Sequence, residues 1–315
     1  MKTIAVTGGT GFVGRALSKT LLEKGYAVRV ISRRPPADPL PGASYAVADF
    51  SDQASLASAL QGCDAAVHLA AALFCRSREA FLKANAGGTA NLVTAANATK
   101  NLRKLVYISS LAAGGPAGDA PRTEADPDAP VSSYGLSKLE GERAVKGFSG
   151  GPAVILRPPI VYGKKDFGFS TIAKWVRRGL MVNAGSAGGK FSFVYLDDLV
   201  HAIAAALGTE KFDGGTFYVC EDRVYSWREF IALLSAGMGV KMPLLVSLPP
   251  WAVYAVGWLY EAVTAVTGAE PALNRDKAKE AAAPNWTCSP TLWEKAAGGA
   301  SWTPLADGIR KTFAR

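Results

Sequence analysis

A group of closely spaced glycines directly behind a short apolar segment restricts this chain to few folds. The segment Thr3-Ile4-Ala5-Val6 is apolar and β-branched, which predicts a buried strand. The glycines that follow allow the backbone to turn sharply and to approach a ligand closely. Apolar residues then recur at helical spacing, so the free N–H groups of a helix N-terminus would face that turn. We therefore expect a dinucleotide phosphate to bind at Gly8, Thr10, Gly11, Phe12, Val13 and Gly14.

A second motif lies far downstream, where Tyr134 and Lys138 are four residues apart in a segment with helical periodicity. On a helix the two side chains share one face. A cation beside the phenol would favour the phenolate and make Tyr134 a usable acid or base near neutral pH. Taken alone, the same spacing also fits a surface tyrosine and lysine with no coupling.

A strand predicted over residues 105–110 ends in Ser109-Ser110. Hydroxyl groups at the carboxyl end of a parallel strand lie where open α/β sheets bind ligands. With the glycine turn and the Tyr134–Lys138 pair, this strand resembles the extended short-chain dehydrogenase/reductase family, also called the NAD-dependent epimerase/dehydratase family. The resemblance implies that Ser110 polarises the substrate oxygen and Tyr134 exchanges the proton. Lys138 would then hold the nicotinamide ribose and tune Tyr134.

Further segments carry the same resemblance, although each alone also fits a strand end or a helix cap. Residues 85–91 match a family helix whose first residue, Asn85, supports the catalytic lysine through water. The other matching segments imply contacts with the adenine or the nicotinamide. They contain Asp49, Phe50, Leu69, Ala70, Ala71, Pro158 and Val161.

The residues after the second predicted strand favour NADP over NAD. An NAD site places an acidic residue on the ribose 2′-hydroxyl about 20 residues after the glycines. Ser32 stands at that position, and Arg33 next to it could bind a 2′-phosphate through charge-assisted hydrogen bonds. The alternative is that both arginines of the Arg33-Arg34 pair are solvated loop charges.

Composition is typical of a soluble enzyme. Hydrophobic residues make up 49% of the 315, and the formal net charge is +9. No nucleic-acid motif accompanies the positive charges, so dinucleotide phosphates or an anionic membrane surface explain the excess better. Four dispersed cysteines and two histidines argue against a metal site. Unpaired thiols without a signal peptide predict a cytoplasmic setting.

Strand-like and helix-like segments alternate up to Arg157, which predicts an α/β doubly wound parallel sheet, a Rossmann fold. We expect residues 1–162 to form the NAD(P)-binding domain and residues 163–315 a smaller, mostly helical substrate-binding part. Residues 191–207 are expected to return to the Rossmann domain, through a strand over 191–195 and a helix over 199–207. Asp197-Asp198 would cap that helix rather than form a catalytic pair.

Two segments of the second half bear on the substrate. Relatives that bind nucleotide sugars carry an arginine just before the return strand, where this chain has Phe191, although Arg177, Arg178 or Arg275 could substitute. The apolar segment Trp251–Val266 is predicted as a helix too short to span a bilayer. It would pack in the core, line an apolar substrate mouth or lie on a membrane. Similar helices occur in relatives resembling 3β-hydroxysteroid dehydrogenases and dihydroflavonol-type reductases.

The sequence thus predicts an NADP-preferring oxidoreductase that transfers hydride between the nicotinamide and an alcohol or ketone carbon of an apolar or cyclic substrate. One alternative is a nucleotide-sugar epimerase or dehydratase with tightly bound cofactor and no net redox. Another is a non-catalytic nucleotide-binding subunit, which the complete set of Ser110, Tyr134 and Lys138 disfavours. A homodimer and peripheral membrane contact through Trp251–Val266 are left open.

Overall fold

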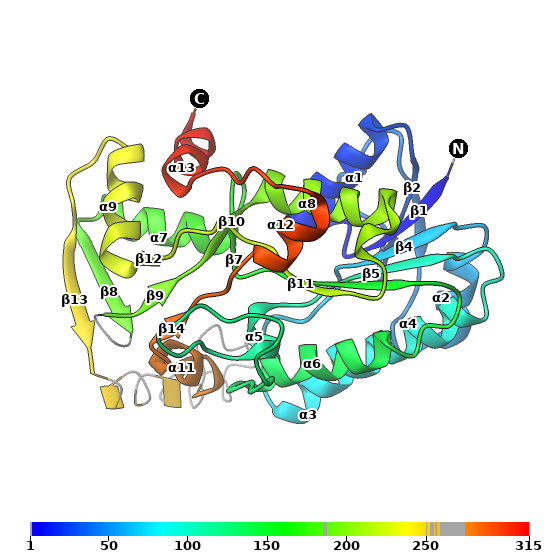
Figure 1. Cartoon of the computed structure of the whole chain (residues 1–315), viewed down its shortest axis with the longest axis horizontal. Helices are drawn as coiled ribbons and strands as arrows, with labels where there is room; N and C mark the ends of the chain where they lie inside the picture. Colours follow the sequence, from blue (N-terminus) through cyan, green and yellow to red (C-terminus); the bar gives the residue numbers. More distant parts are fainter. Residues whose placement is uncertain are drawn as a thin grey trace.

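Seven parallel strands form the central sheet, in the order β11-β6-β5-β4-β1-β2-β3 (Figure 1). The computed structural model describes residues 2–184, 188–249, 251–252, 255, 257–258 and 275–314. The predicted Rossmann fold is confirmed, and the strands alternate with helices except between β2 and β3, which no helix separates. The strands are β1 (Thr3–Thr7), β2 (Ala27–Ser32), β3 (Ser44–Val47), β4 (Ala65–His68), β5 (Lys104–Ile108), β6 (Ala153–Arg157) and β11 (Thr216–Tyr218).

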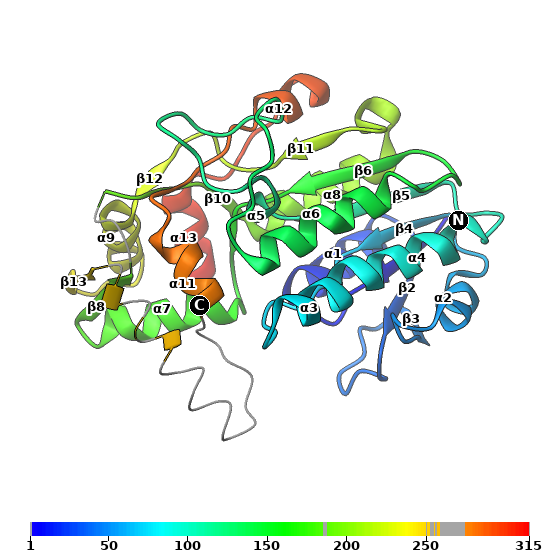
Figure 2. The ribbon, with the colours of Figure 1, turned by 90° about the horizontal axis from the view of Figure 1, so that it is seen from below.

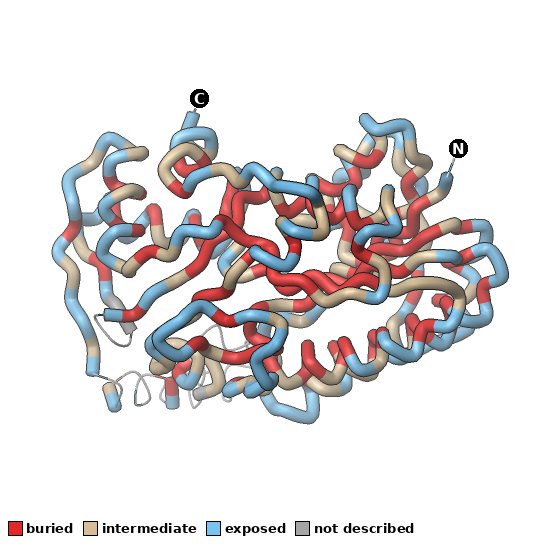
Figure 3. Tube along the Cα trace, viewed as in Figure 1, coloured by how far each residue is buried: buried red, intermediate tan, exposed pale blue. Residues whose placement is uncertain are grey.

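Helices cover both faces of the sheet (Figure 2). On one face, α1 (Phe12–Glu23) and α8 (Leu196–Gly208) pack on each other and on a core of strand residues. The other face carries α2 (Gln53–Leu60), α4 (Gly88–Asn97) and α6 (Ser133–Val145). The strands run through the most buried part of the molecule, as Figure 3 shows, which explains their near-continuous apolar sequences.

The order of the strands reverses between β1 and β4. From β1 the chain leads through α1 to β2, which lies on one side in the sheet. From β4 it leads to β5, which lies on the opposite side. A crevice forms outside the carboxyl ends of the strands at such a reversal, and ligands of open α/β sheets bind there. The glycine turn after β1 and residues 69–71 after β4 both lie at this edge.

A second group of elements has its own aromatic core, in which Phe169, Phe193 and Phe230 are buried. Its helices α7 (Phe167–Arg177), α9 (Trp227–Gly237) and α13 (Leu305–Phe313) surround short strands. These are β7 (Ile160–Tyr162), β8 (Leu180–Ala184), β9 (Lys190–Phe191), β10 (Phe193–Tyr195), β12 (Tyr225–Ser226), β13 (Leu244–Leu248) and β14 (Asn285–Trp286). The remaining elements are α3 (Arg78–Phe81), the π-helix η1 (Leu82–Gly87), α5 (Leu111–Gly114), the 3-10 helix η2 (Glu210–Phe212), α11 (Arg275–Ala282) and α12 (Thr291–Ala297).

Three details differ from the sequence analysis. The strand expected over 191–195 is interrupted at Ser192 into β9 and β10, and neither belongs to the seven-stranded sheet. Helix α8 begins at Leu196 with Tyr195 at its N-cap, so Asp197 and Asp198 lie in its first turn and do not cap it. Asp198 instead accepts hydrogen bonds from the backbone and side chain of Thr303. Strand β11, which completes the sheet beside β6, was not predicted.

Most of the apolar segment Trp251–Val266 lies outside the described residues. Within it, the side chains of Trp251 and Trp258 are 73% and 60% exposed. These two indoles are therefore not packed in a core. Over the part of the chain that the structure describes, no helix combines the length and the apolar character needed to cross a bilayer.

Candidate active site

The glycine turn after β1 is too crowded for side chains at two of its positions. Gly8 has a positive φ of 69°, and a Cβ at Gly8 would lie 2.8 Å from the backbone nitrogen of Ala70. A Cβ at Gly14 would lie 2.2 Å from the carbonyl oxygen of Gly8. At Gly11 the nearest atom is 3.3 Å away, so protein packing there is less restrictive. Helix α1 starts at the next residue, Phe12, and directs its first N–H groups toward this turn.

The turn is tied to the end of β4 by side chains. Thr7 Oγ1 lies 2.7 Å from Nδ1 of His68 and accepts a hydrogen bond from the backbone of Ala70 at 3.2 Å. Nε2 of His68 lies 3.0 Å from Oγ1 of Thr89. Burial, and secondly the charge of Lys138, lower the pKa of His68 to about 3. His68 is therefore a neutral structural link that positions Leu69, Ala70 and Ala71 beside the glycine turn.

A hollow of about 510 Å³ lies at the end of β2 and is lined by Thr10, Ser32, Arg33, Arg34, Pro35 and Pro36. Arg33 is exposed there, and the hydroxyl of Ser32 donates to the carbonyl of Arg34 at 2.7 Å. Asp49 is also exposed. Its hydrogen bonds with Ser51, and more weakly the charge of Arg33, lower its pKa. Next to it, Phe50 stacks on His68 with ring centroids 5.7 Å apart. Arg33 thus places a positive charge in this hollow, and position 32 carries a serine in place of an acidic residue.

Tyr134 lies in the first turn of α6 and faces Ser110. The side chain of Ser132 caps the helix by accepting from the backbone of Gly135 at 2.9 Å. Ser110 is the N-cap of α5, where its side chain accepts from the backbone of Ala112 at 3.1 Å, and it lies close enough to the phenol of Tyr134 to affect the pKa of that group. Ser109 points elsewhere and donates to Glu142 at 2.5 Å. Of the two serines after β5, Ser110 is the one beside the tyrosine.

Lys138 follows on the same helix and is fully buried. Its Nζ donates to the carbonyl of Ile108 at 2.7 Å and lies 4.1 Å from the ring centroid of Tyr107. Burial lowers the pKa of Lys138 to about 7, although the charge of Glu142 opposes this shift. The predicted lowering of the Tyr134 pKa is not found. Burial, followed by the charge of Glu280, raises the pKa of Tyr134, and the nearby hydroxyl of Ser110 only partly offsets them.

Asn85 occupies the π-helix η1, a local widening that often marks functional positions. Its side chain accepts from the backbone of Ala72 at 2.7 Å, and donates to the carbonyl of Ala72 and to the hydroxyl of Ser137. These contacts connect the segment after β4 with Ser137 of α6, which is the residue before Lys138. None of these hydrogen bonds is to Lys138 itself.

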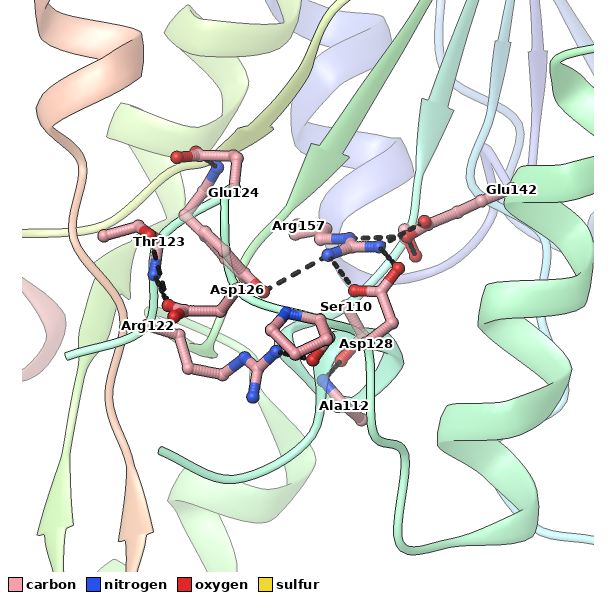
Figure 4. A network of polar contacts seen from close by, with 12 residues as sticks. Ser110, Ala112, Arg122, Thr123, Glu124, Asp126, Asp128, Glu142 and Arg157 are labelled. Atoms are coloured by element: carbon pink, nitrogen blue, oxygen red, sulfur yellow. Dashed lines mark hydrogen bonds and ion pairs between the residues drawn. The ribbon is translucent and has the colours of Figure 1, made fainter. Parts of the chain in front are cut away.

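A buried ion network holds α6 against the end of β6 (Figure 4). Arg157, the last residue of β6, pairs with Glu142 at 2.6 Å and with Asp128 at 2.7 Å. The side chains of Arg157 and Glu142 are only 5% and 3% exposed. The network thus fixes the helix that carries Tyr134 and Lys138.

Beyond Arg157, the backbone carbonyl of Pro158 accepts a hydrogen bond from the backbone N–H of Leu111, and Val161 in β7 pairs with Val194.

Helix α11 covers the start of α6, which the sequence analysis missed. The two carboxylate oxygens of Asp276 accept hydrogen bonds from the backbone of Ser133 at 2.7 Å and of Tyr134 at 3.3 Å. Ser132 donates to Glu280 at 2.6 Å. More than 140 residues separate these partners, so no local spacing could have revealed them. The one hint of these contacts in the sequence was the charged composition of the segment that forms α11.

The described residues contain no group of histidine, cysteine or acidic side chains able to hold a metal ion. All four cysteines are free thiols. Two of them, Cys220 and Cys288, are buried with their sulfur atoms 3.5 Å apart. The functional groups gathered at the carboxyl edge of the sheet are therefore hydroxyls, a lysine and backbone N–H groups.

Comparison with known proteins agrees with this geometry. The model of the NAD dependent epimerase/dehydratase family matches residues 4–220. The chain is 27% identical to a ceramide reductase of Caulobacter vibrioides, over 98% of this chain and 92% of that protein. A putative dihydroflavonol 4-reductase of a Synechocystis strain is 31% identical over 88% and 84% of the two chains. The structure of MoeE5 in complex with UDP-glucuronic acid and NAD superimposes with a TM-score of 0.79, at 20% identity over 98% and 97%.

Proposed function

Because this chain belongs to the NAD dependent epimerase/dehydratase family of extended short-chain dehydrogenases/reductases, we propose that it is an NADP(H)-preferring oxidoreductase. It would act on an alcohol or ketone carbon of an apolar or cyclic substrate. The observation that carries the proposal is the placement of Ser110 and Tyr134 beside buried Lys138, at the carboxyl edge of β5. Net consumption of NADPH with a ketone tests it.

The side chains would divide the chemistry as follows. When bound, the nicotinamide supplies or accepts hydride. Ser110 donates a hydrogen bond to the substrate oxygen, and Tyr134 gives that oxygen its proton. Lys138 holds the nicotinamide ribose, and Asn85 supports it through water. The raised pKa of Tyr134 keeps the phenol protonated in the free protein, as a proton donor in carbonyl reduction must be.

The residues at the sheet edge fit a dinucleotide. The turn formed by Gly8, Gly11 and Gly14 is tightly packed backbone that leads into the N-terminus of α1, where the first N–H groups of the helix could bind a phosphate. Thr10, Phe12 and Val13 complete this turn. Asp49, Phe50 and residues 69–71 would contact the adenine side, and Pro158 and Val161 the nicotinamide. We retain residues 1–162 as the cofactor-binding domain and residues 163–315 as the substrate-binding part.

The hollow beside Arg33 supports the preference for NADP. We expect the double variant Ser32→Asp, Arg33→Asn to bind NADP about tenfold more weakly or worse and to prefer NAD. A charge-assisted hydrogen bond to the phosphate is lost and a repulsive carboxylate is added. Titration of both cofactors checks this, with Arg103→Asn as an exposed control that changes neither affinity. Wild-type protein that binds NAD as tightly as NADP would refute the assignment.

The substrate class rests on two features. At the position where nucleotide-sugar relatives carry an arginine this chain has Phe191, which is half-buried beside Trp227. Two relatives are a ceramide reductase and a putative dihydroflavonol 4-reductase, whose names denote reduction. The alternative, a nucleotide-sugar epimerase or dehydratase, is supported by the family and by the UDP-glucuronic acid bound to MoeE5. Conversion of a nucleotide sugar without net redox would favour that alternative.

Exposed Trp251 and Trp258 support peripheral contact with a membrane. We expect Trp258→Glu to reduce co-sedimentation with anionic liposomes while the melting temperature is kept. The control is Leu292→Glu, an exposed apolar residue on α12. If substrate binding falls instead, the indole lines a substrate mouth. If sedimentation and activity with apolar ketones are both unchanged, Trp258 takes no part in either role.

A further inference from the structure

A pair of opposite charges on α11 lies directly beside the proposed proton donor. The ammonium nitrogen of Lys277 is 5.0 Å from the ring centroid of Tyr134. The same nitrogen lies 2.7 Å from a carboxylate oxygen of Glu280, and the two side chains are only 29% and 18% exposed. Charges in such a partly desolvated position act more strongly on a neighbour than they would in water.

Helix α11 is held in this position by hydrogen bonds to the start of α6. Asp276 accepts from two N–H groups of the first turn, which have no partner within the helix. Glu280 accepts from the side chain of the N-cap residue Ser132. The contacts run from the carboxylates of one helix to the cap and first turn of the other. The distance between the charge pair and Tyr134 is therefore set by α11 as a unit.

Among the described residues, the charged and titratable groups around Tyr134 come from three elements. Helix α11 contributes Asp276, Lys277 and Glu280, and α6 contributes Lys138. Strand β5 contributes the phenol of Tyr107, whose pKa is raised by burial. Phe81 of α3 packs edge-on against Tyr134 but carries no charge. Asp276 is engaged by N–H groups, and within the described part of the chain Lys277, Glu280 and Lys138 are the further charged side chains beside the phenol.

We propose that Glu280 and Lys277 are positioning residues that set the protonation of Tyr134, with Glu280 holding the phenol as a proton donor and Lys277 opposing it. The inference rests on the proposed function and deepens it, because it names the residues that control the proton donor. In carbonyl reduction the phenol would give its proton to the carbonyl oxygen, and the reduced nicotinamide, when bound, would supply the hydride. Solvent then reprotonates the phenolate. The raised pKa of Tyr134, of which Glu280 is the second cause after burial, agrees with this role.

The test measures the ionisation of Tyr134 directly and needs no substrate. Tyrosinate absorbance is followed against pH in the complex with NADP⁺, and the curve of the Tyr134→Phe variant is subtracted. Glu280→Gln should ionise at lower pH than wild type, and Lys277→Met at higher pH. Each shift should be on the order of one pH unit, the size produced by a close charge. Opposite shifts follow because the two variants remove charges of opposite sign.

Glu140→Gln is the matched control, since Glu140 lies on α6 itself and pairs with exposed Arg143. It should leave the curve unchanged, and circular dichroism should show that all variants are folded. Coincident curves for wild type, Glu280→Gln and Lys277→Met, or shifts of the same sign in the two variants, would overturn the inference. Failure of NADP⁺ to bind would instead refute the proposed function, so the two failures are distinguishable.

Discussion

Tyr134→Phe should lower turnover by about 10²–10⁴-fold, the range contributed by a positioned general acid or base. The ring would remain in place against Phe81, and only the hydroxyl that faces Ser110 would be lost. Affinity for the cofactor should stay near that of wild type, because the glycine turn and Lys138 are unchanged. Initial rates of NADPH oxidation with a ketone, together with cofactor titration, measure both effects.

Tyr26→Phe serves as the control for this loss. Tyr26 is partly buried against the core of the sheet on the side of α1 and α8, so removal of its hydroxyl should leave turnover unchanged. If Tyr134→Phe keeps full activity, the hydroxyl is not the proton donor. If it loses cofactor binding as well as turnover, the tyrosine acts on the cofactor site rather than on the substrate oxygen.

Arg157→Met should lower the free energy of unfolding by about 3–5 kcal/mol, the cost of leaving a buried charge without its partner. Glu142 is 3% exposed and receives two hydrogen bonds from Arg157. Asp128 is about one-third exposed and can be hydrated once the arginine is gone. The uncompensated charge of Glu142 is therefore the main source of the loss. Chemical denaturation measures it.

The matched control is Arg143→Met, which removes an exposed arginine whose partner Glu140 lies on the same helix. An exposed pair of this kind contributes about 1 kcal/mol or less. The double variant Arg157→Met, Glu142→Met should regain much of the stability, since neither member of the buried Arg157–Glu142 pair is then left without its partner. Equal stability of Arg157→Met and Arg143→Met would show that the buried network is not what holds α6 against β6.

Local sequence patterns predicted the parts of the site that are formed by neighbours in the chain. The glycine turn needs one strand, one turn and one helix, and all three lie within the first 23 residues. Tyr134 and Lys138 share a face because they are one helical turn apart. The capping of α6 by Ser132 follows from residue type at a helix start. Such features depend on short-range geometry, which periodicity and residue type express directly.

The features that were missed or wrong depend on long-range packing. Asp276 contacts the backbone of Tyr134 across 142 residues, and β11 joins the sheet only after several intervening elements. The two aspartates at the start of α8 were predicted as caps, yet Asp198 accepts hydrogen bonds from Thr303, which is 105 residues away. The direction of the pKa shift of Tyr134 in the free protein depends on such packing too. Burial and Glu280 dominate, and neither can be read from the spacing of two residues.

The balance of cofactor and product tests the central claim most directly. The protein is incubated with NADPH and a panel of apolar cyclic ketones, and in parallel with nucleotide sugars, and both cofactor absorbance and products are followed. We predict one NADPH oxidised for each alcohol formed, faster than with NADH, and no turnover of nucleotide sugars. Conversion of a nucleotide sugar with no net change in the reduced cofactor, and no reaction with any ketone, would contradict it.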